Sequence, residues 1–373
     1  MKRFVLAPDS FKGTMSAAEL CDIWEQAIQA RIPGADCRRF PLADGGEGMV
    51  DALLSMCGGR KVTARVSGPF GRPVEAEYGI LPGGRAVIEM AACAGLPLVG
   101  ERKDPERATT YGVGELIRHA VKNGAKEVVL GLGGSATNDC GIGMAAALGY
   151  RFLDADGRPL EPLALHMERV ARIERPGAPL NLRVTAACDV DNPLCGPTGA
   201  TFTFGMQKGA QGQVADLLER GMKNMAGILR RDLGADVLTL PGAGAAGGLG
   251  AGTVAFLGGK LVPGIELMLD AARFDEALAG ADMVFTGEGR IDWQSARGKV
   301  PVGVSRRCRK AGVPCVALCG SIGKGAEAVY GEGITAVFSA TPGICTFADV
   351  KRTCREDMAR LTDAVLRLLL ING

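Results

Sequence analysis

The stretch "VVLGLGGSATNDCGIGMAAALGY" at residues 128–150 decides the fold prediction, because it joins an apolar run, a glycine-rich turn and an alanine-rich segment. The apolar run is typical of a buried strand, and the segment after the turn predicts a helix over residues 138–149. A buried strand that leads directly into a helix indicates an α/β fold with a parallel sheet. Such a turn can also hold a phosphate, so the stretch raises the question of what it binds.

The two ends of the chain repeat this alternation of strand and helix. Residues 3–8 predict a buried strand, and Ser16 with Glu19 forms a capping box at the start of a helix. Between residues 60 and 90, short alternating runs broken by Gly-Pro pairs predict antiparallel hairpins. Further strands are predicted at 37–42, 127–132, 182–188, 282–287, 314–321 and 335–341, and further helices at 50–57, 112–123, 296–311 and 350–371.

The length of 373 residues predicts two domains. The fold class expected is α/β, with two α/β domains around a cleft. The first domain is discontinuous, with residues 1–65 plus 276–373, and has a mainly parallel sheet. The second, residues 66–275, is inserted into the first and carries the glycine-rich phosphate loop.

Charge and hydropathy exclude several classes of function. The net charge is +2 and the charged residues are interspersed, so we expect no nucleic-acid partner and no membrane partner. The uncharged stretch 241–259 holds eight glycines but only four large apolar residues, which argues against a membrane span. Its first part, residues 241–252, is a second glycine-rich stretch, which predicts either close packing of two elements or a backbone surface for a base or phosphate, and the sequence favours neither.

Cysteine and histidine usage narrows the chemistry. The twelve cysteines include no CxxC pair and lie mostly in apolar runs, which predicts reduced thiols and a cytoplasmic enzyme. The two histidines, His119 and His166, lie where structural roles are expected. Serine–histidine triads and histidine-rich metal sites are therefore disfavoured, and acid–base chemistry falls to carboxylates or lysine.

Polar side chains follow several of the predicted strands. The carboxyl ends of parallel strands share one edge of a sheet, where ligands gather. Any single aspartate there can instead be a helix cap, but the combination of carboxylates and cations indicates a site for a polyanion with a metal ion. The residues in these loops are Asp9, Ser10 and Lys12, then Asp44, then Asp189, and finally Glu288, Arg290, Asp292 and Lys299.

The loop quoted first lacks the lysine of a Walker motif. None of the Gly-Lys pairs at 259–260, 298–299 and 323–324 fits the required spacing. A helix start alone contributes only about 0.3–1 kcal/mol toward an anion, so we expect Lys12, Arg290 and Lys299 to supply the charge. The alternative is a tight strand-to-helix turn capped by Thr137 or Asn138.

The longer motifs of the chain occur in a recognisable order. They are "LAPDSFKGTMSA", "PLADGGEGMVDAL", "GLGGSATNDCGIGMAAALG", "ACDVDNPLCGPTGAT", "FGMQKGA" and "TGEGRIDWQSARGKVPVGV". Together they resemble the type-1 glycerate kinase family almost from end to end. The resemblance implies ATP-dependent phosphorylation of D-glycerate, 2-phosphoglycerate as the product, a place in glyoxylate metabolism, and two α/β domains around a cleft.

The roles of individual residues are our own hypotheses. Asp189 would orient or deprotonate the glycerate hydroxyl, and Lys12 would assist catalysis. The glycerate pocket would be lined by Asp9, Ser10, Asp44 and Arg290. The ATP phosphates would be held by Gly133, Gly134, Ser135, Thr137, Asn138 and Lys299, and Mg²⁺ by Glu288 and Asp292.

Two other functions stay open at this point. One is a kinase for another small hydroxy acid, since substrate size depends on side chains that sequence does not place. The other is a non-enzymatic sensor that binds a small acid. The amphipathic helix at the C-terminus is expected to pack on the sheet, with a homodimer surface as the alternative.

Overall fold

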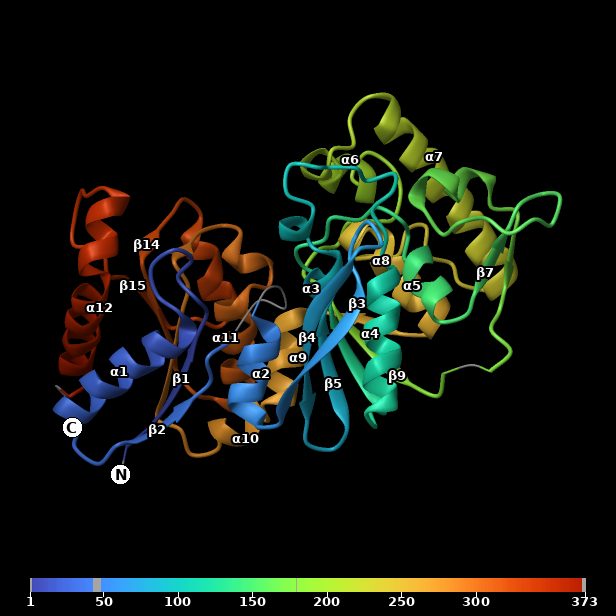
Figure 1. Ribbon diagram of the computed structural model, residues 1–373. Coiled ribbons are helices and arrows are strands. Elements are labelled where there is room, and N and C mark those ends of the chain that lie inside the picture. Colours follow the sequence, from blue (N-terminus) through green and yellow to red (C-terminus); the bar gives the residue numbers. More distant parts are fainter. Residues whose placement is uncertain (1, 43–47, 179, 371–373) are drawn as a thin grey trace. The chain divides into compact units, whose positions relative to one another are not determined.

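The computed structural model describes residues 2–42, 48–178 and 180–370. The chain forms two compact units, one of Met1–Asp44 with Ile265–Gly373 and one of Gly45–Gly264. Each unit contains a sheet with helices packed on it (Figure 1). The predicted α/β fold class is confirmed, and one unit is inserted into a discontinuous other unit.

The first unit contains a parallel sheet with the strand order β15-β13-β11-β1-β2. From β1 the chain continues to β2 on one side, whereas the later strands β11, β13 and β15 follow on the other side. The place between β1 and β11 is therefore the topological switch point of the sheet. The strands are β1 Arg3–Pro8, β2 Asp36–Arg39, β11 Met283–Gly287, β13 Cys315–Cys319 and β15 Ala336–Ser339, and a parallel pair is formed by β12 Arg290–Ile291 and β14 Ser321–Ile322. The helices are α1 Ala17–Arg31, α9 Gly264–Ala271, α10 Phe274–Leu278, α11 Val300–Ala311 and α12 Phe347–Leu369.

Helices α1, α11 and α12 of this unit form close to where the sequence predicts them, whereas α9 and α10 were not predicted. The capping box at Ser16 is present, because its hydroxyl accepts from Glu19 N and the Glu19 carboxylate accepts from Ser16 N. Helices α1 and α12 pack on each other, and Trp24, Phe285 and Met358 share one core between these helices and the sheet. The C-terminal helix α12 thus packs within its own unit, as expected from the sequence. A homodimer surface was the alternative.

The second unit contains a mixed sheet with the strand order β10-β9-β6-β5-β4-β3. Strands β5, β6, β9 and β10 are parallel, and β3 and β4 form the predicted antiparallel hairpin. The strands are β3 Arg60–Ser67, β4 Pro73–Leu81, β5 Arg85–Glu89, β6 Glu127–Gly131, β9 Arg183–Ala187 and β10 Lys260–Val262, with a separate pair β7 Arg151–Leu153 and β8 Arg172–Glu174. The helices are α2 Met49–Cys57, α3 Ala91–Ala94, α4 Tyr111–Lys122, α5 Ile142–Ala147, α6 Ala200–Phe204, α7 Gln213–Ile228 and α8 Ala245–Leu257.

The division between the units falls earlier than the predicted boundaries at 65/66 and 275/276. The structure divides the chain at 44/45 and 264/265. Strand β3 belongs to the second unit because it pairs with β4 along its whole length, and α2 packs on β4 and β5. At the other boundary, Ile265 packs closely against Gly303 of α11, so α9 belongs with the first unit.

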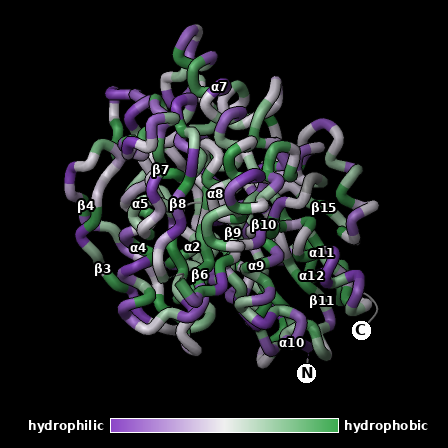
Figure 2. Tube along the Cα trace, turned by 90° about the vertical axis from the view of Figure 1, so that its right-hand side faces the viewer, coloured by the Kyte–Doolittle hydropathy of each residue, from purple (hydrophilic) through white to green (hydrophobic). Residues whose placement is uncertain are grey.

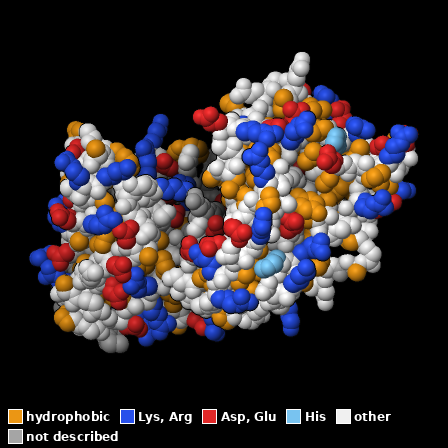
Figure 3. Space-filling model, viewed as in Figure 1, with side chains coloured by type: hydrophobic (Ala, Val, Ile, Leu, Met, Phe, Trp, Pro, Cys, Tyr) orange, Lys and Arg blue, Asp and Glu red, His pale blue; other side chains and the backbone are white. Residues whose placement is uncertain are grey.

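Hydrophobic residues gather inside each unit and hydrophilic residues lie mainly in outer turns (Figure 2). Lysine, arginine, aspartate and glutamate are mixed over the face seen in Figure 3, as the interspersed sequence pattern indicates. Among the described residues, no helix combines the length and the apolar character needed to cross a membrane.

The cysteines and histidines have the environments that the sequence suggested. All twelve cysteines are free thiols, and burial raises the pKa of the Cys21 thiol to about 12. The His119 ring is hydrogen-bonded at Nδ1 to the Tyr78 hydroxyl at 3.0 Å. The ring of His166 is bonded at Nδ1 to the Glu161 carbonyl oxygen at 3.1 Å.

Candidate active site

A pocket of about 720 Å³ lies in the first unit at the carboxyl ends of the strands around the switch point. The loops after β1 and β11 meet there, since Asp9 N donates to Gly287 O at 2.8 Å. Its walls also include the loops after β13 and β15 and the start of α12. The lining residues are Asp9, Ser10, Phe11, Lys12, Thr14, Met15, Glu288, Gly289, Arg290, Asp292, Gln294, Lys299, Gly320, Ser321, Ala340, Thr341, Gly343, Ile344, Cys345, Phe347, Val350, Cys354 and Asp357.

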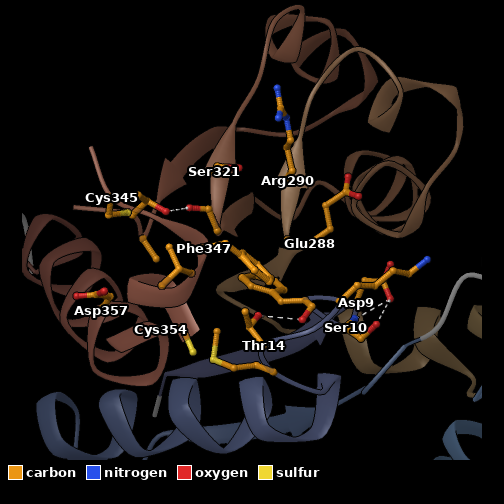
Figure 4. Close-up of a pocket in the computed structure, with 18 of the residues that line it drawn as sticks. Asp9, Ser10, Thr14, Glu288, Arg290, Ser321, Cys345, Phe347, Cys354 and Asp357 are labelled. Carbon is orange, nitrogen blue, oxygen red and sulfur yellow. Dashed lines mark hydrogen bonds between the residues drawn. The ribbon is translucent and has the colours of Figure 1, made fainter. Parts of the chain in front are cut away.

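The pocket brings together many of the residues that sequence reasoning selected. In the view of Figure 4, Asp9, Ser10, Glu288 and Arg290 lie on one side, and Cys345, Cys354 and Asp357 on the other. The predicted site residues in its lining are Asp9, Ser10, Lys12, Glu288, Arg290, Asp292 and Lys299. Asp44 lies outside the described residues.

Glu288 is the most constrained carboxylate of the pocket. It is only 6% exposed, and it accepts hydrogen bonds from Ser295 Oγ at 2.5 Å and Lys299 Nζ at 3.1 Å. Burial raises the pKa of Glu288, and the bonds from Ser295 and Lys299 oppose that effect. The Lys299 ammonium is therefore fixed beside a carboxylate at the pocket wall.

Arg290 presents its charge to solvent at the same edge. Its side chain is 64% exposed and its Nε lies 3.6 Å from Asp292 Oδ2. The Asp292 side chain also accepts from Gln294 N at 2.9 Å, which orders the turn after β12. On the other side of the switch point, Asp9 is buried, and its Oδ1 accepts from Ser10 N at 2.7 Å.

The predicted metal pair is only part of a coordination shell. Among the described residues, no group of three or more histidine, cysteine, aspartate or glutamate side chains is arranged to hold a metal ion. Glu288 and Asp292 nevertheless offer oxygen atoms of the kind Mg²⁺ takes. Mg²⁺ usually binds through one or two carboxylates, with water and substrate phosphates completing the shell, so this donor set fits it.

The glycine-rich loop after β6 lies in the second unit and differs from the prediction. Its tip is accessible at Gly133 and Gly134, but Thr137 and Asn138 have no exposed surface. Asn138 Nδ2 donates to Thr201 Oγ1 at 3.0 Å in the interior. Of the residues of this loop chosen for phosphate binding, only the two glycines are thus presented at the surface, and Ser135 is buried.

The helix predicted over 138–149 is shorter, and this prediction was wrong at its start. Helix α5 begins at Ile142, after Gly141 with φ of 72°. Asp139 is the reason, because its buried carboxylate accepts from Gly141 N at 3.1 Å and Gly143 N at 3.3 Å. The same carboxylate accepts from Thr110 N and Oγ1, both at 2.8 Å. Asp139, and neither Thr137 nor Asn138, orders the turn.

Lys208 is a residue of this region that sequence reasoning missed. It lies in the motif "FGMQKGA" and is 2% exposed. Its ammonium donates to Ser135 Oγ at 2.6 Å and to Thr137 O at 2.7 Å. Burial lowers the pKa of Lys208 to about 7, against the opposing attraction of Asp139. A lysine followed by a glycine gives no sign of burial, so only its place within a long motif could have drawn attention to it.

The second glycine-rich stretch packs directly beneath this loop. Ala246, Gly247 and Gly248 are left-handed, and Gly247 O accepts from Cys140 N at 3.0 Å. A Cβ at Gly247 would lie 2.0 Å from Thr137 O, and one at Gly252 would lie 2.7 Å from Cys140 O. Of the two alternatives left open by the sequence, the structure favours close packing.

Asp189 follows β9 in the second unit and is exposed. Its Oδ1 accepts from Gly264 N at 2.8 Å, at the first residue of α9. The side chain therefore has the capping contact that is common for an aspartate after a strand, and it is not among the residues that line the switch-point pocket.

Cations and carboxylates at the ends of parallel strands are typical of an enzyme that handles phosphorylated substrates. Comparison with known proteins identifies which enzyme class this is. The model of the glycerate kinase family matches residues 4–370. The chain belongs to the glycerate kinase family and is an enzyme, a kinase that acts on glycerate.

Relatives and a solved structure agree with this assignment. The chain is 45% identical to a glycerate kinase of Halalkalibacterium halodurans over 92% of each chain. It is 40% identical to the glycerate 2-kinase of Escherichia coli strain K12, over 99% of this chain and 98% of the relative. A crystal structure that carries the name glycerate kinase 2, from Salmonella typhimurium LT2, superposes with a TM-score of 0.88 at 41% identity, covering 99% of this chain and 98% of that one.

Proposed function

We propose that the chain transfers the γ-phosphate of ATP to D-glycerate, with Mg²⁺, and releases 2-phosphoglycerate and ADP. The observation that carries the proposal is the switch-point pocket, whose lining includes the cations Lys12, Arg290 and Lys299 as well as the carboxylates Glu288 and Asp292. The name of the Escherichia coli relative, glycerate 2-kinase, supports the choice of the carbon-2 hydroxyl.

The cations and the carboxylates of the pocket have complementary tasks in this proposal. Lys12 and Arg290 neutralise the glycerate carboxylate and the phosphoryl group in transfer, and Asp9 and Ser10 accept and donate hydrogen bonds to hydroxyl groups. Lys299, whose ammonium donates to Glu288 at 3.1 Å, contacts a phosphate of ATP in this proposal. Glu288 and Asp292 would hold Mg²⁺, which would neutralise further charge on the phosphate oxygens.

In this proposal the second unit contributes the Asp189 side chain and the backbone of the loop after β6. Asp189 removes the proton of the attacking hydroxyl, or orients it, as the transferred group leaves ADP. The backbone of Gly133 and Gly134 contacts phosphate oxygens, while Ser135, Thr137 and Asn138 support that backbone from within. The free thiols of the chain are the support for a cytoplasmic location, which we propose as well.

The test is a coupled assay of purified protein with Mg-ATP and D-glycerate, in which ADP release is followed and the product is identified by phosphorus NMR. We expect ADP release that requires glycerate and a product with phosphate on carbon 2. Phosphate on carbon 3 would contradict the regiochemistry and leave the kinase assignment intact. Faster turnover of another small hydroxy acid from a substrate panel would replace D-glycerate as the acceptor.

A further inference from the structure

The switch-point pocket has two chemically different ends. Its polar end contains the charged residues of the strand-end loops described above. Its other end, here called the apolar end, is formed by Phe11 and Met15 after β1, and by residues before and within α12. The six residues that define the apolar end are Phe11, Met15, Ile344, Phe347, Val350 and Cys354.

The apolar end is unsuited to glycerate. A three-carbon acid with two hydroxyl groups has almost no apolar surface to bury, and it needs charged or polar partners on every side. A pocket of about 720 Å³ falls in the range of roughly 300–1,000 Å³ that encloses drug-sized ligands. A ligand that fills it must combine a polyanionic part with a larger apolar part.

Phe347 supplies an aromatic surface at this end. It is the first residue of α12, directly after the capping residue Thr346, and its side chain is 58% exposed. Its ring is held by its neighbours, because Lys351 Nζ lies 5.1 Å from the ring centroid. A Cβ at Gly13 would lie 3.4 Å from Phe347 Cζ, so the ring also touches the loop after β1. An exposed aromatic ring in a pocket is a platform on which a nucleobase can stack.

Asp357 adds an acceptor beside the apolar residues. It lines the pocket and is 7% exposed. Its Oδ2 accepts from Thr353 Oγ1 at 2.7 Å and its Oδ1 from Arg360 at 2.6 Å. Each carboxylate oxygen can accept a second hydrogen bond, which suits the hydroxyl groups of a ribose.

We propose that the apolar end binds the nucleoside of the phosphate donor, with the base against Phe347 and the ribose toward Asp357. The phosphates then extend to the polar end, toward Lys12, Arg290 and Lys299. This proposal rests on the proposed function, because it takes ATP as the donor. It places the base in the first unit, whereas the glycine-rich loop of the second unit contacts phosphate at most.

The experiment measures ADP binding by calorimetry, without glycerate, to the wild-type chain and to Phe347→Ala. Loss of a stacked base is expected to weaken ADP binding by roughly 5- to 100-fold. The matched control is Phe202→Ala, which removes a phenylalanine that is 47% exposed on α6, outside the pocket lining, and should leave ADP affinity unchanged. In steady state, Phe347→Ala should raise KM for ATP and leave KM for glycerate and the saturated kcat unchanged.

The outcomes separate this proposal from the function it rests on. Equal ADP affinity in wild type and Phe347→Ala would overturn the nucleoside site and leave the ATP-dependent reaction standing. A raised KM for glycerate with unchanged KM for ATP would assign the apolar end to the acceptor and also overturn it. Wild-type protein that binds no ADP and turns over no ATP would overturn the proposed donor itself, and the nucleoside site with it.

Discussion

The strand ends of the two units show two uses of the same architecture. In the first unit, the loops after β1 and β11 leave a pocket whose walls carry charged side chains. In the second unit, the loop after β6 is packed from beneath by the left-handed segment Ala246–Gly248 and by the buried ammonium of Lys208. Among the described residues, the strand ends of the first unit surround an open pocket, whereas the loop after β6 in the second unit exposes only its tip at Gly133 and Gly134.

The comparison teaches that glycine content alone does not identify a binding loop. The glycines of the second stretch, residues 241–252, are required because neighbouring backbone leaves no room for a Cβ at several of them. Their role is to bring one backbone close to another and so to fix the exposed tip Gly133–Gly134. The first unit depends instead on the identity of its charged side chains.

The largest expected effect is on kcat and comes from a substitution in the second unit. It tests whether residues outside the first unit take part in the reaction. Asp189→Asn should lower kcat by about 10²–10⁴-fold, because the amide cannot take the hydroxyl proton. The matched control is Asp191→Asn, also an exposed aspartate of the same loop, which should retain kcat. If kcat of Asp189→Asn stays within a few-fold of wild type, the aspartate is only the cap of α9.

The packing role of the second glycine stretch can be tested with two positions of similar backbone conformation. Gly247→Ala should lower the free energy of unfolding by about 3 kcal/mol, because φ is +65° and the added Cβ meets Thr137 O at 2.0 Å. Gly258→Ala also has a positive φ, +60°, but open space around it, so about 1 kcal/mol is expected. Urea unfolding measures both, and equal losses would show that packing against the loop is unimportant.

Lys208 should make the stability of the second unit depend on pH. Its pKa is about 7 in the folded chain and its ordinary value is 10.5, so between these values the unfolded chain binds more protons. The contribution of Lys208 to stability therefore rises as pH increases from 7 toward 10.5. From pH 7 to pH 9, the unfolding free energy of wild type should rise by about 2 kcal/mol relative to that of Lys208→Met. A difference that is constant across this range would contradict a lowered pKa.

The smallest expected effect concerns the metal in the first unit. Glu288→Gln should raise the Mg²⁺ concentration needed for half-maximal rate by about tenfold, because a neutral amide is a weaker ligand than a carboxylate. Glu332→Gln is the control, since that carboxylate pairs with Arg306 at 2.7 Å outside the pocket lining. An unchanged Mg²⁺ dependence in Glu288→Gln would remove Glu288 from the metal site.

Much of the fold could be predicted because its signals are local. Periodicity and the capping box at Ser16 placed α1, and apolar or alternating runs placed the strands of both sheets except β10. The start of α5 could not be predicted, because it depends on Asp139, whose partner Thr110 lies 29 residues away in sequence. The unit boundary at 44/45 likewise depends on the packing of α2 on β4 and β5, which no local pattern fixes.

The candidate site could likewise be predicted only in part from the sequence. Strand-end reasoning selected Asp9, Glu288 and Arg290, and the topology of the sheet brings them to one pocket. It also selected Thr137 and Asn138, whose burial arises from contacts with segments distant in the chain. Lys208 was missed for the same reason, because a long-range contact and not the local sequence buries its ammonium.

The switch-point pocket also contains a thiol that can be labelled. Cys345 lines the pocket and is exposed, whereas the other eleven thiols of the chain are buried or half-buried. A maleimide fluorophore should therefore modify the wild-type protein first at Cys345, without any engineered cysteine. The dye would report by its change in emission whether a compound from a library has entered the pocket, so the native chain could serve as its own screening reagent.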